Sequence, residues 1–173
     1  MLHHWSEIEQ QAMPHQWSYA QFLQALCELE VDHRSQARLK RALSEATLPT
    51  GKSFSSFNFD HCPQLNPVPR MQLAQDPAWL TRAENCLLFG PSGTGKTHLA
   101  AALGRAAIEQ GQRAKFFGAT TLVQHLQQAK SQLLLPTALN KLDRFDLLIV
   151  DDLGYVKKSE AETSVLFELI AHR

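Results

Sequence analysis

The chain has 173 residues with 17 basic and 17 acidic side chains, so its formal net charge is +0. This balance excludes a globally basic nucleic-acid-binding domain, although it leaves room for a local basic patch. Apolar residues make up 44% and charged residues 20% of the chain, which is typical of a globular protein and excludes a disordered chain. The length suits one domain with an appendage.

Three cysteines, Cys27, Cys62 and Cys86, are scattered along the chain. Their spacing matches no metal site and an odd number cannot pair completely, so we expect reduced thiols in a cytoplasmic protein. The first residues do not have the basic and apolar pattern of a signal peptide, and no later segment is apolar for long enough to span a bilayer. No membrane partner is therefore expected.

The first predicted element is a helix that begins near Ser18. Ser18 and Gln21 have the spacing of a capping box, and apolar residues then recur at helical intervals until proline and glycine end the pattern at 48–51. On this helix three arginines, which we name the arginine stripe, fall at i, i+4 and i+7 and share one face: Arg34, Arg38 and Arg41. A solvated helix face is the favoured interpretation, and contact with DNA phosphates is the alternative.

A linker is predicted from Gly51 to about Asn66. Its three phenylalanines are expected to pack against the following domain rather than to stack on bases: Phe54, Phe57 and Phe59. Asp76 and Pro77 are typical of a helix start, and they predict a short helix through residues 79–80.

Five further elements are predicted from periodicity, caps and glycine stops. They are a helix at 97–110, a strand at 114–119, a helix at 121–134, a strand at 145–151 and a helix at 159–173. Thr120 or Thr121 is expected to cap the second of these helices, and Ser159 with Glu162 forms a capping box for the last. The strand at 145–151 is a continuous apolar run, which is typical of a parallel strand buried on both faces.

The sequence GPSGTGKT at 90–97 matches the phosphate-loop pattern G-x-x-x-x-G-K-[ST] in full. An apolar run at 86–90, predicted as a strand, precedes the loop, and a predicted helix follows it. Glycines let backbone N–H groups wrap a phosphate, and the helix start adds unpaired amides. The residues expected to bind the nucleotide are Gly90, Pro91, Ser92, Gly93, Thr94, Gly95, Lys96, Thr97 and His98.

Catalytic roles follow from the same pattern together with the acidic end of the strand at 145–151. Lys96 is expected to reach the β and γ phosphates of ATP. Thr97 offers a hydroxyl to Mg²⁺, and Asp151 is expected to hold the same ion through water. Asp152 can orient the attacking water. The expected catalytic residues are thus Lys96, Asp151 and Asp152, with Thr97 and Asp151 at the metal.

Other nucleotide patterns compete with this interpretation. The sequence GKS at 51–53 lacks the upstream glycine of a phosphate loop. The guanine pattern NKLD at 140–143 precedes the DDLG at 151–154, whereas GTPases have the reverse order, so ATP is predicted rather than GTP. A small-substrate kinase is a less favoured alternative, because Lys157 and Lys158 are the only basic residues between Tyr155 and the last predicted helix, where a kinase needs an arginine-rich lid.

The stretches GPSGTGKTHLAAALG (90–104) and FDLLIVDDLGY (145–155), with the helical start and the SFSSFNF linker, resemble the IstB-like transposition helper ATPases, relatives of DnaC-type helicase loaders. The resemblance covers the chain from about Ser18 onward. It implies an α/β fold, an AAA+ P-loop ATPase with a parallel sheet flanked by helices, after a small helical N-terminal region. The implied division is 1–50, a linker at 51–75, and part of the ATP-binding domain at 76–173.

The resemblance also implies ATP and Mg²⁺ as cofactors, and double-stranded DNA and a transposase as partners. It implies a homo-oligomer when full length, and it favours DNA contact by the arginine stripe. A DnaC-like replicative helicase loader, with a helicase as partner, and a non-hydrolysing binding fragment are the alternatives.

Two departures from the family pattern limit the expected activity. The family's sensor strand and arginine finger follow the helix at 159–173, and the sequence stops at Arg173 before them. Because that sensor strand lies between the phosphate-loop strand and the acidic strand, the two are expected to lack the strand that bridges them, which leaves unpaired backbone on both. Asp152 also stands where glutamate is frequent, which predicts slower hydrolysis. We therefore expect a chain that keeps the phosphate site but is compromised as a hydrolase.

Overall fold

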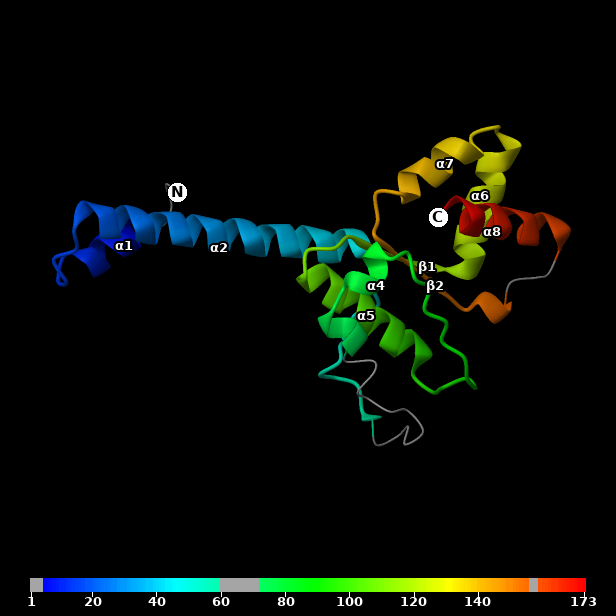
Figure 1. Ribbon diagram of the computed structural model, residues 1–173, viewed down its shortest axis with the longest axis horizontal. Coiled ribbons are helices and arrows are strands. Elements are labelled where there is room, and N and C mark those ends of the chain that lie inside the picture. Colours follow the sequence, from blue (N-terminus) through cyan, green and yellow to red (C-terminus); the bar gives the residue numbers. More distant parts are fainter. Residues whose placement is uncertain (1–4, 60–71, 156–158) are drawn as a thin grey trace. The chain divides into compact units, whose positions relative to one another are not determined.

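The computed structural model describes residues 5–59, 72–155 and 159–173. Contacts within the chain define two compact units, Met1–Arg41 and Ala42–Arg173 (Figure 1). The predicted division at residues 50 and 75 stays a prediction. Within the described ranges, no helix combines the length and the apolar character that crossing a bilayer requires.

The first unit holds α1 (Trp5–Ala12) and most of α2 (Tyr19–Ala46). The capping box predicted for α2 is confirmed, because the Gln21 N–H donates to the Ser18 hydroxyl at 3.3 Å and the Ser18 N–H donates to the Gln21 side-chain oxygen at 2.8 Å. Helix α1 was not predicted. It spans eight residues and buries Ile8.

The last turn of α2 belongs to the second unit, where it is attached to the strand β1 (Ala114–Gly118). The Thr47 hydroxyl donates to the Phe116 carbonyl at 3.1 Å, and the Lys115 ammonium donates to the Glu45 carbonyl at 2.8 Å. The Glu45 carboxylate pairs with Arg144 at 2.9 Å. These bonds hold the end of α2 beside β1.

The sheet consists of β1 and β2 (Leu147–Asp151), paired in parallel, among the residues that the structure describes. The register aligns Ala114 with Leu147 and Gly118 with Asp151, so Asp151 lies at the carboxyl edge next to Gly118. The crossover between the strands contains α6 (Ala119–Ser131) and α7 (Leu135–Leu142), as parallel pairing requires a long connection.

Helices cover both faces of this sheet (Figure 1). Helix α5 (Lys96–Glu109) packs against β1 and β2, with Gly104 opposite Ile149. On the other face, α6, α7 and α8 (Glu160–His172) form an apolar cluster, and Leu148 and Val150 of β2 pack against it. Because Leu148 and Val150 point away from Ile149 along the strand, β2 is apolar on both faces.

The predicted α/β class, with parallel strands flanked by helices after a helical N-terminal region, is confirmed. The short helix after Asp76 is α4 (Ala78–Thr81), and the Asp76 carboxylate accepts from the Ala78 N–H at 2.9 Å. The capping box of α8 is confirmed in both directions. A turn of 3-10 helix, η2 (Leu153–Tyr155), follows β2.

Two local predictions were wrong. Helix α6 begins at Ala119, two residues before the predicted start, and Gly118 is its N-cap without a side-chain bond, so neither Thr120 nor Thr121 caps it. Residues 86–90 form no strand. A strand there needs a hydrogen-bonded neighbour, and both described strands pair only with each other.

Candidate phosphate-binding site

Three glycines give the loop at 90–97 a backbone that other residues rarely adopt. The φ angles are 152° at Gly90, 79° at Gly93 and 79° at Gly95, all in the region where a Cβ is disfavoured. An added Cβ at Gly90 would also lie 3.2 Å from the Thr94 hydroxyl. The glycines therefore permit a tight turn whose backbone can approach a ligand closely.

Helix α5 begins directly after this turn, at Lys96. Its N-cap, Gly95, makes no side-chain capping bond, and the first helical bond runs from the Leu99 N–H to the Gly95 carbonyl at 2.9 Å. The N–H groups of the first turn are consequently left without a helical acceptor and carry the positive end of the helix dipole. A phosphate oxygen fits this environment.

The Lys96 ammonium folds back over the loop. Its Nζ atom donates to the Gly90 carbonyl at 2.8 Å and to the Pro91 carbonyl at 2.6 Å. The Thr94 hydroxyl also donates to the Pro91 carbonyl, at 2.9 Å. These bonds close the turn and place a positive charge at it, which suits an anion.

The two predicted catalytic carboxylates lie at the end of β2. Asp151 is the last strand residue and is half-buried, and Asp152 follows it with a φ of 60°, exposed to solvent. Helix α5 packs on β2 and so connects this end of the sheet to the loop. No hydrogen bond joins either carboxylate to residues 90–97, all of which the structure describes. The shared metal site of Thr97 and Asp151 stays a prediction.

The imidazole of His98 has partners that the sequence did not predict. His98 was expected at the nucleotide, yet its Nε2 atom lies 2.9 Å from the Ser53 carbonyl and 3.1 Å from the Ser56 hydroxyl. The sequence contains only a weak indication of this contact. Three serines lie among phenylalanines in the segment SFSSF, more than 40 residues before His98. Such spacing does not identify a contact.

The segment before the loop is accessible. Leu87 is 68% exposed and Phe89 is 87% exposed, although both are apolar. Side chains of a buried central strand would instead be covered on both faces. The segment therefore departs from the strand expected in front of the loop.

One known protein family matches this chain over its whole length. The sequence model of the family described as IstB-like ATP binding protein matches residues 1–173. The chain belongs to the IstB-like ATP binding protein family. The resemblance noted from residues 90–104 and 145–155 is thereby confirmed.

Several relatives of this IstB-like chain carry names that refer to insertion sequences. A protein of Sinorhizobium fredii named as an insertion sequence ATP-binding protein is 50% identical over 98% of this chain and 57% of its own length. The ATP-binding protein named for insertion sequence IS21 of Pseudomonas aeruginosa is 33% identical over 100% of this chain and 65% of its own length. The one named for IS5376 of Geobacillus stearothermophilus is 32% identical over 100% and 68%. The chain thus spans 57% to 68% of the length of these relatives.

The competing nucleotide patterns lie in other structural settings in this IstB-like chain. Residues 51–53 follow α2 in a turn and do not open a helix. Asn140, Lys141 and Leu142 form the last turn of α7. A guanine-binding pattern would instead follow a strand, so the structure agrees with the preference for the loop at 90–97.

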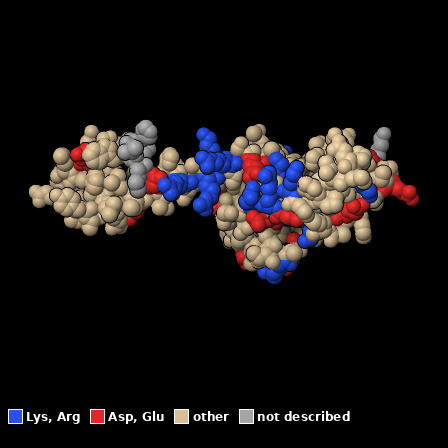
Figure 2. Space-filling model, turned by 90° about the horizontal axis from the view of Figure 1, so that it is seen from above, with Lys and Arg blue, Asp and Glu red and all other residues tan. Residues whose placement is uncertain are grey.

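The arginine stripe of the IstB-like chain lies on α2 and is exposed. Arg34 pairs with Glu30 at 2.7 Å, and in the described part of the chain Arg38 and Arg41 form no ion pair. Figure 2 shows basic side chains gathered along this helix. All three arginines are exposed, and Arg38 and Arg41, which form no ion pair with the described residues, are available to an anionic surface.

Proposed function

We propose that this chain is an ATP-binding helper protein of DNA transposition. The observation that carries the proposal is the phosphate loop, where positive-φ glycines, a free helix start and the Lys96 ammonium converge. Relatives named as insertion sequence ATP-binding proteins support ATP as the ligand and transposition as the context. We infer a cytoplasmic location from the three scattered cysteines, an odd number without a disulfide pattern.

The residues present fit a nucleoside triphosphate with a magnesium ion. Backbone N–H groups between Gly93 and Thr97 would hold phosphate oxygens, and the Lys96 ammonium would exchange its two carbonyl acceptors for phosphate. The Thr97 hydroxyl and Asp151 would hold the metal, and Asp152 would orient a water. When bound, Mg²⁺ supplies neutralisation of phosphate charge.

DNA, a transposase and further copies of the chain are the proposed partners. The exposed arginine stripe supports contact with duplex phosphates, because Arg38 and Arg41 have no acidic partner among the described residues. ATP-dependent assembly on DNA and stimulation of the transposase are activities that we propose for the complete protein. A DnaC-like helicase loader is the second candidate, since it would share the loop and differ in partner.

Turnover by the 173-residue chain is proposed to be weak. The segment in front of the loop lies outside the sheet, and Asp151 and Asp152 have no bond to the loop. Catalysis of phosphoryl transfer depends on positioning these groups, so a loosely connected site would bind better than it hydrolyses. Binding without turnover is also what the non-hydrolysing fragment alternative predicts.

Nucleotide binding is tested by titrating a fluorescent ATP analogue with Mg²⁺ into the wild type, Lys96→Ala and Lys141→Ala. Lys96→Ala should raise the Kd by at least about tenfold, since it removes a charge-assisted bond to phosphate. Lys141→Ala is the matched control, because Lys141 lies on α7 in the guanine-like pattern, and it should leave the Kd unchanged. Equal Kd values for all three proteins would contradict the proposal.

Partner and turnover are tested separately. ATP hydrolysis is measured with and without duplex DNA, for this chain and for a chain extended through any downstream reading frame. DNA-stimulated hydrolysis by the extended chain, lost with Lys96→Ala, supports the transposition helper. Rapid ATP turnover by the short chain that ignores DNA would instead favour the small-substrate kinase.

A further inference from the structure

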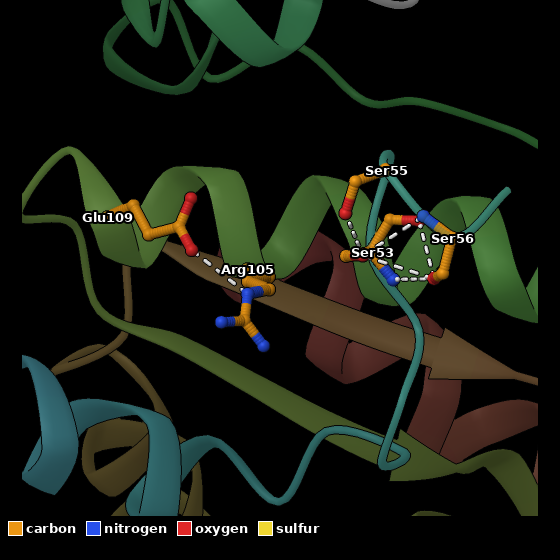
Figure 3. Close-up of polar contacts among 5 residues, drawn as sticks. All are labelled: Ser53, Ser55, Ser56, Arg105 and Glu109. Carbon is orange, nitrogen blue, oxygen red and sulfur yellow. Dashed lines mark hydrogen bonds and ion pairs between the residues drawn. The ribbon is translucent and has the colours of Figure 1, made fainter.

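Residues 51–59 form a tight turn beside α5. The Ser53 N–H donates to the Ser56 hydroxyl at 2.9 Å, and the Ser56 N–H donates to the Ser53 hydroxyl at 3.3 Å. The Ser56 hydroxyl in turn donates to the Gly51 carbonyl at 2.8 Å. Figure 3 shows the side chains of Ser53, Ser55 and Ser56 gathered in this turn, next to the helix that carries Arg105 and Glu109. These hydrogen bonds give the turn an internal structure of its own.

His98 attaches this turn to the first turn of α5. Its Nε2 atom lies 2.9 Å from the Ser53 carbonyl oxygen, which can only accept a hydrogen bond. Nε2 must therefore carry a hydrogen and donate it. The Ser56 hydroxyl, 3.1 Å from the same atom, receives part of this bond. The contact joins two segments that are 45 residues apart in the chain.

Phe57 brings the same turn onto the phosphate loop. A Cβ added to Gly95 would lie 2.6 Å from the Phe57 ring, so the ring occupies the space next to Gly95. The ring also meets the His98 imidazole edge to face, with centroids 5.1 Å apart, and Phe59 at 4.7 Å. Because the Phe57 ring lies directly against Gly95, a shift of the loop backbone at Gly95 displaces the ring or separates it from the loop. Gly95 is also the residue directly before Lys96.

We propose that His98 is a positioning residue for a nucleoside triphosphate: its bond to Ser53 keeps Phe57 against Gly95 and so couples occupancy of the loop to residues 51–59. This inference rests on the proposed nucleotide binding. Occupancy requires the Lys96 ammonium to leave the Gly90 and Pro91 carbonyls, and the released turn rearranges next to Gly95. Residues 51–59 follow the end of α2, which is bonded to β1.

Hydrogen–deuterium exchange of peptides covering 51–59 tests the coupling. It is measured with and without the magnesium complex of a non-hydrolysable ATP analogue, for the wild type, Lys96→Ala, His98→Ala, His98→Gln and His125→Ala. The glutamine amide can replace the Nε2–H donor, and His125 is an exposed histidine of α6 that serves as the matched control. Direct titration of the same analogue gives the Kd of each protein.

The wild type should show nucleotide-dependent exchange at 51–59, and His98→Ala should lose this response while its Kd rises by about 3- to 10-fold. His98→Gln should retain the response, as should His125→Ala. A purely structural role for His98 would lower the melting temperature without removing the response. If His98→Ala does not fold, Phe57→Leu takes its place, because it withdraws the ring from Gly95 and should abolish the same response.

Two failures are distinguishable. If the wild type binds the analogue no better than Lys96→Ala does, nucleotide binding is refuted and the coupling with it. If the wild type binds and Lys96→Ala does not, but His98→Ala and Phe57→Leu match the wild type in Kd and in exchange, the role of His98 alone is refuted.

Discussion

Gly104 of α5 lies against Ile149 of the sheet, and its replacement by alanine measures how tightly the two elements are packed. An added Cβ would lie 2.5 Å from the Ile149 Cδ1 atom and 3.1 Å from a Leu48 methyl carbon. Alanine in place of glycine inside a helix stabilises it by about 1 kcal/mol. Overpacking of a core contact costs about 1–3 kcal/mol. The two effects together predict that Gly104→Ala lowers the free energy of unfolding by about 0–2 kcal/mol.

A second substitution separates the two effects. Ile149→Val deletes the Cδ1 methyl that the new Cβ would strike, and by itself it should cost about 0.5–1.5 kcal/mol. In the double variant the methyl is gone and the helix gain remains. The double variant should therefore be at least as stable as Ile149→Val alone, and the favourable coupling between the sites should equal the relieved overpacking of about 1–3 kcal/mol.

Urea unfolding of the wild type, the two single variants and the double variant gives the four free energies. If the destabilisations add to within about 0.5 kcal/mol, the two atoms do not compete for space. That result would refute the packing of α5 on β2 through Gly104. Because α5 begins at the phosphate loop, it would also refute the contact through which the sheet supports the loop.

Two further predictions concern α8. Ser159→Ala removes one half of the capping box and should lower the free energy of unfolding by about 1 kcal/mol, whereas Thr163→Ala, one turn later and exposed, should cost less; equal losses in thermal unfolding would contradict the role of the cap. The hydrogen bond from Lys130, 2.6 Å long, lowers the pKa of Glu168 from 4.5, so the pair stabilises the fold above pH 4.5 and loses its effect as the pH falls through the lowered pKa. Melting temperatures of the wild type and Glu168→Gln should thus differ at pH 7 and converge in acid, and a constant difference from pH 7 to pH 3 would argue against it.

Elements marked by neighbouring residues were predictable from the sequence. Ser18 with Gln21 and Ser159 with Glu162 mark two helix starts correctly, because a capping box needs only residues three apart. Helix α7 was missed although Leu135, Leu139 and Leu142 have helical spacing and a proline stands in its first turn. In that case the helical pattern was present in the sequence, but it covers only 8 residues.

Features that depend on distant partners were not predictable in the same way. The run at 86–90 has the apolar character of a strand, yet strand formation requires a neighbour that local sequence cannot supply. The contact of His98 with Ser53 spans 45 residues and depends on where the turn at 51–59 folds. For the site itself, the loop pattern predicted the glycine geometry correctly. The arrangement of Asp151 and Asp152 relative to the loop could be described only from the folded structure, because the two segments are far apart in the sequence.

The left-handed backbone at Asp152 limits which residues evolution can place there. At a φ of 60°, aspartate, asparagine and glycine are tolerated best, because a short polar side chain can bond to its own backbone. A change to glutamate needs only one extra methylene, but the longer side chain loses that compensation and would meet a penalty of about 1 kcal/mol in the folded state. The turn therefore favours aspartate over glutamate at this position through the backbone alone, independently of what the carboxylate does to a water.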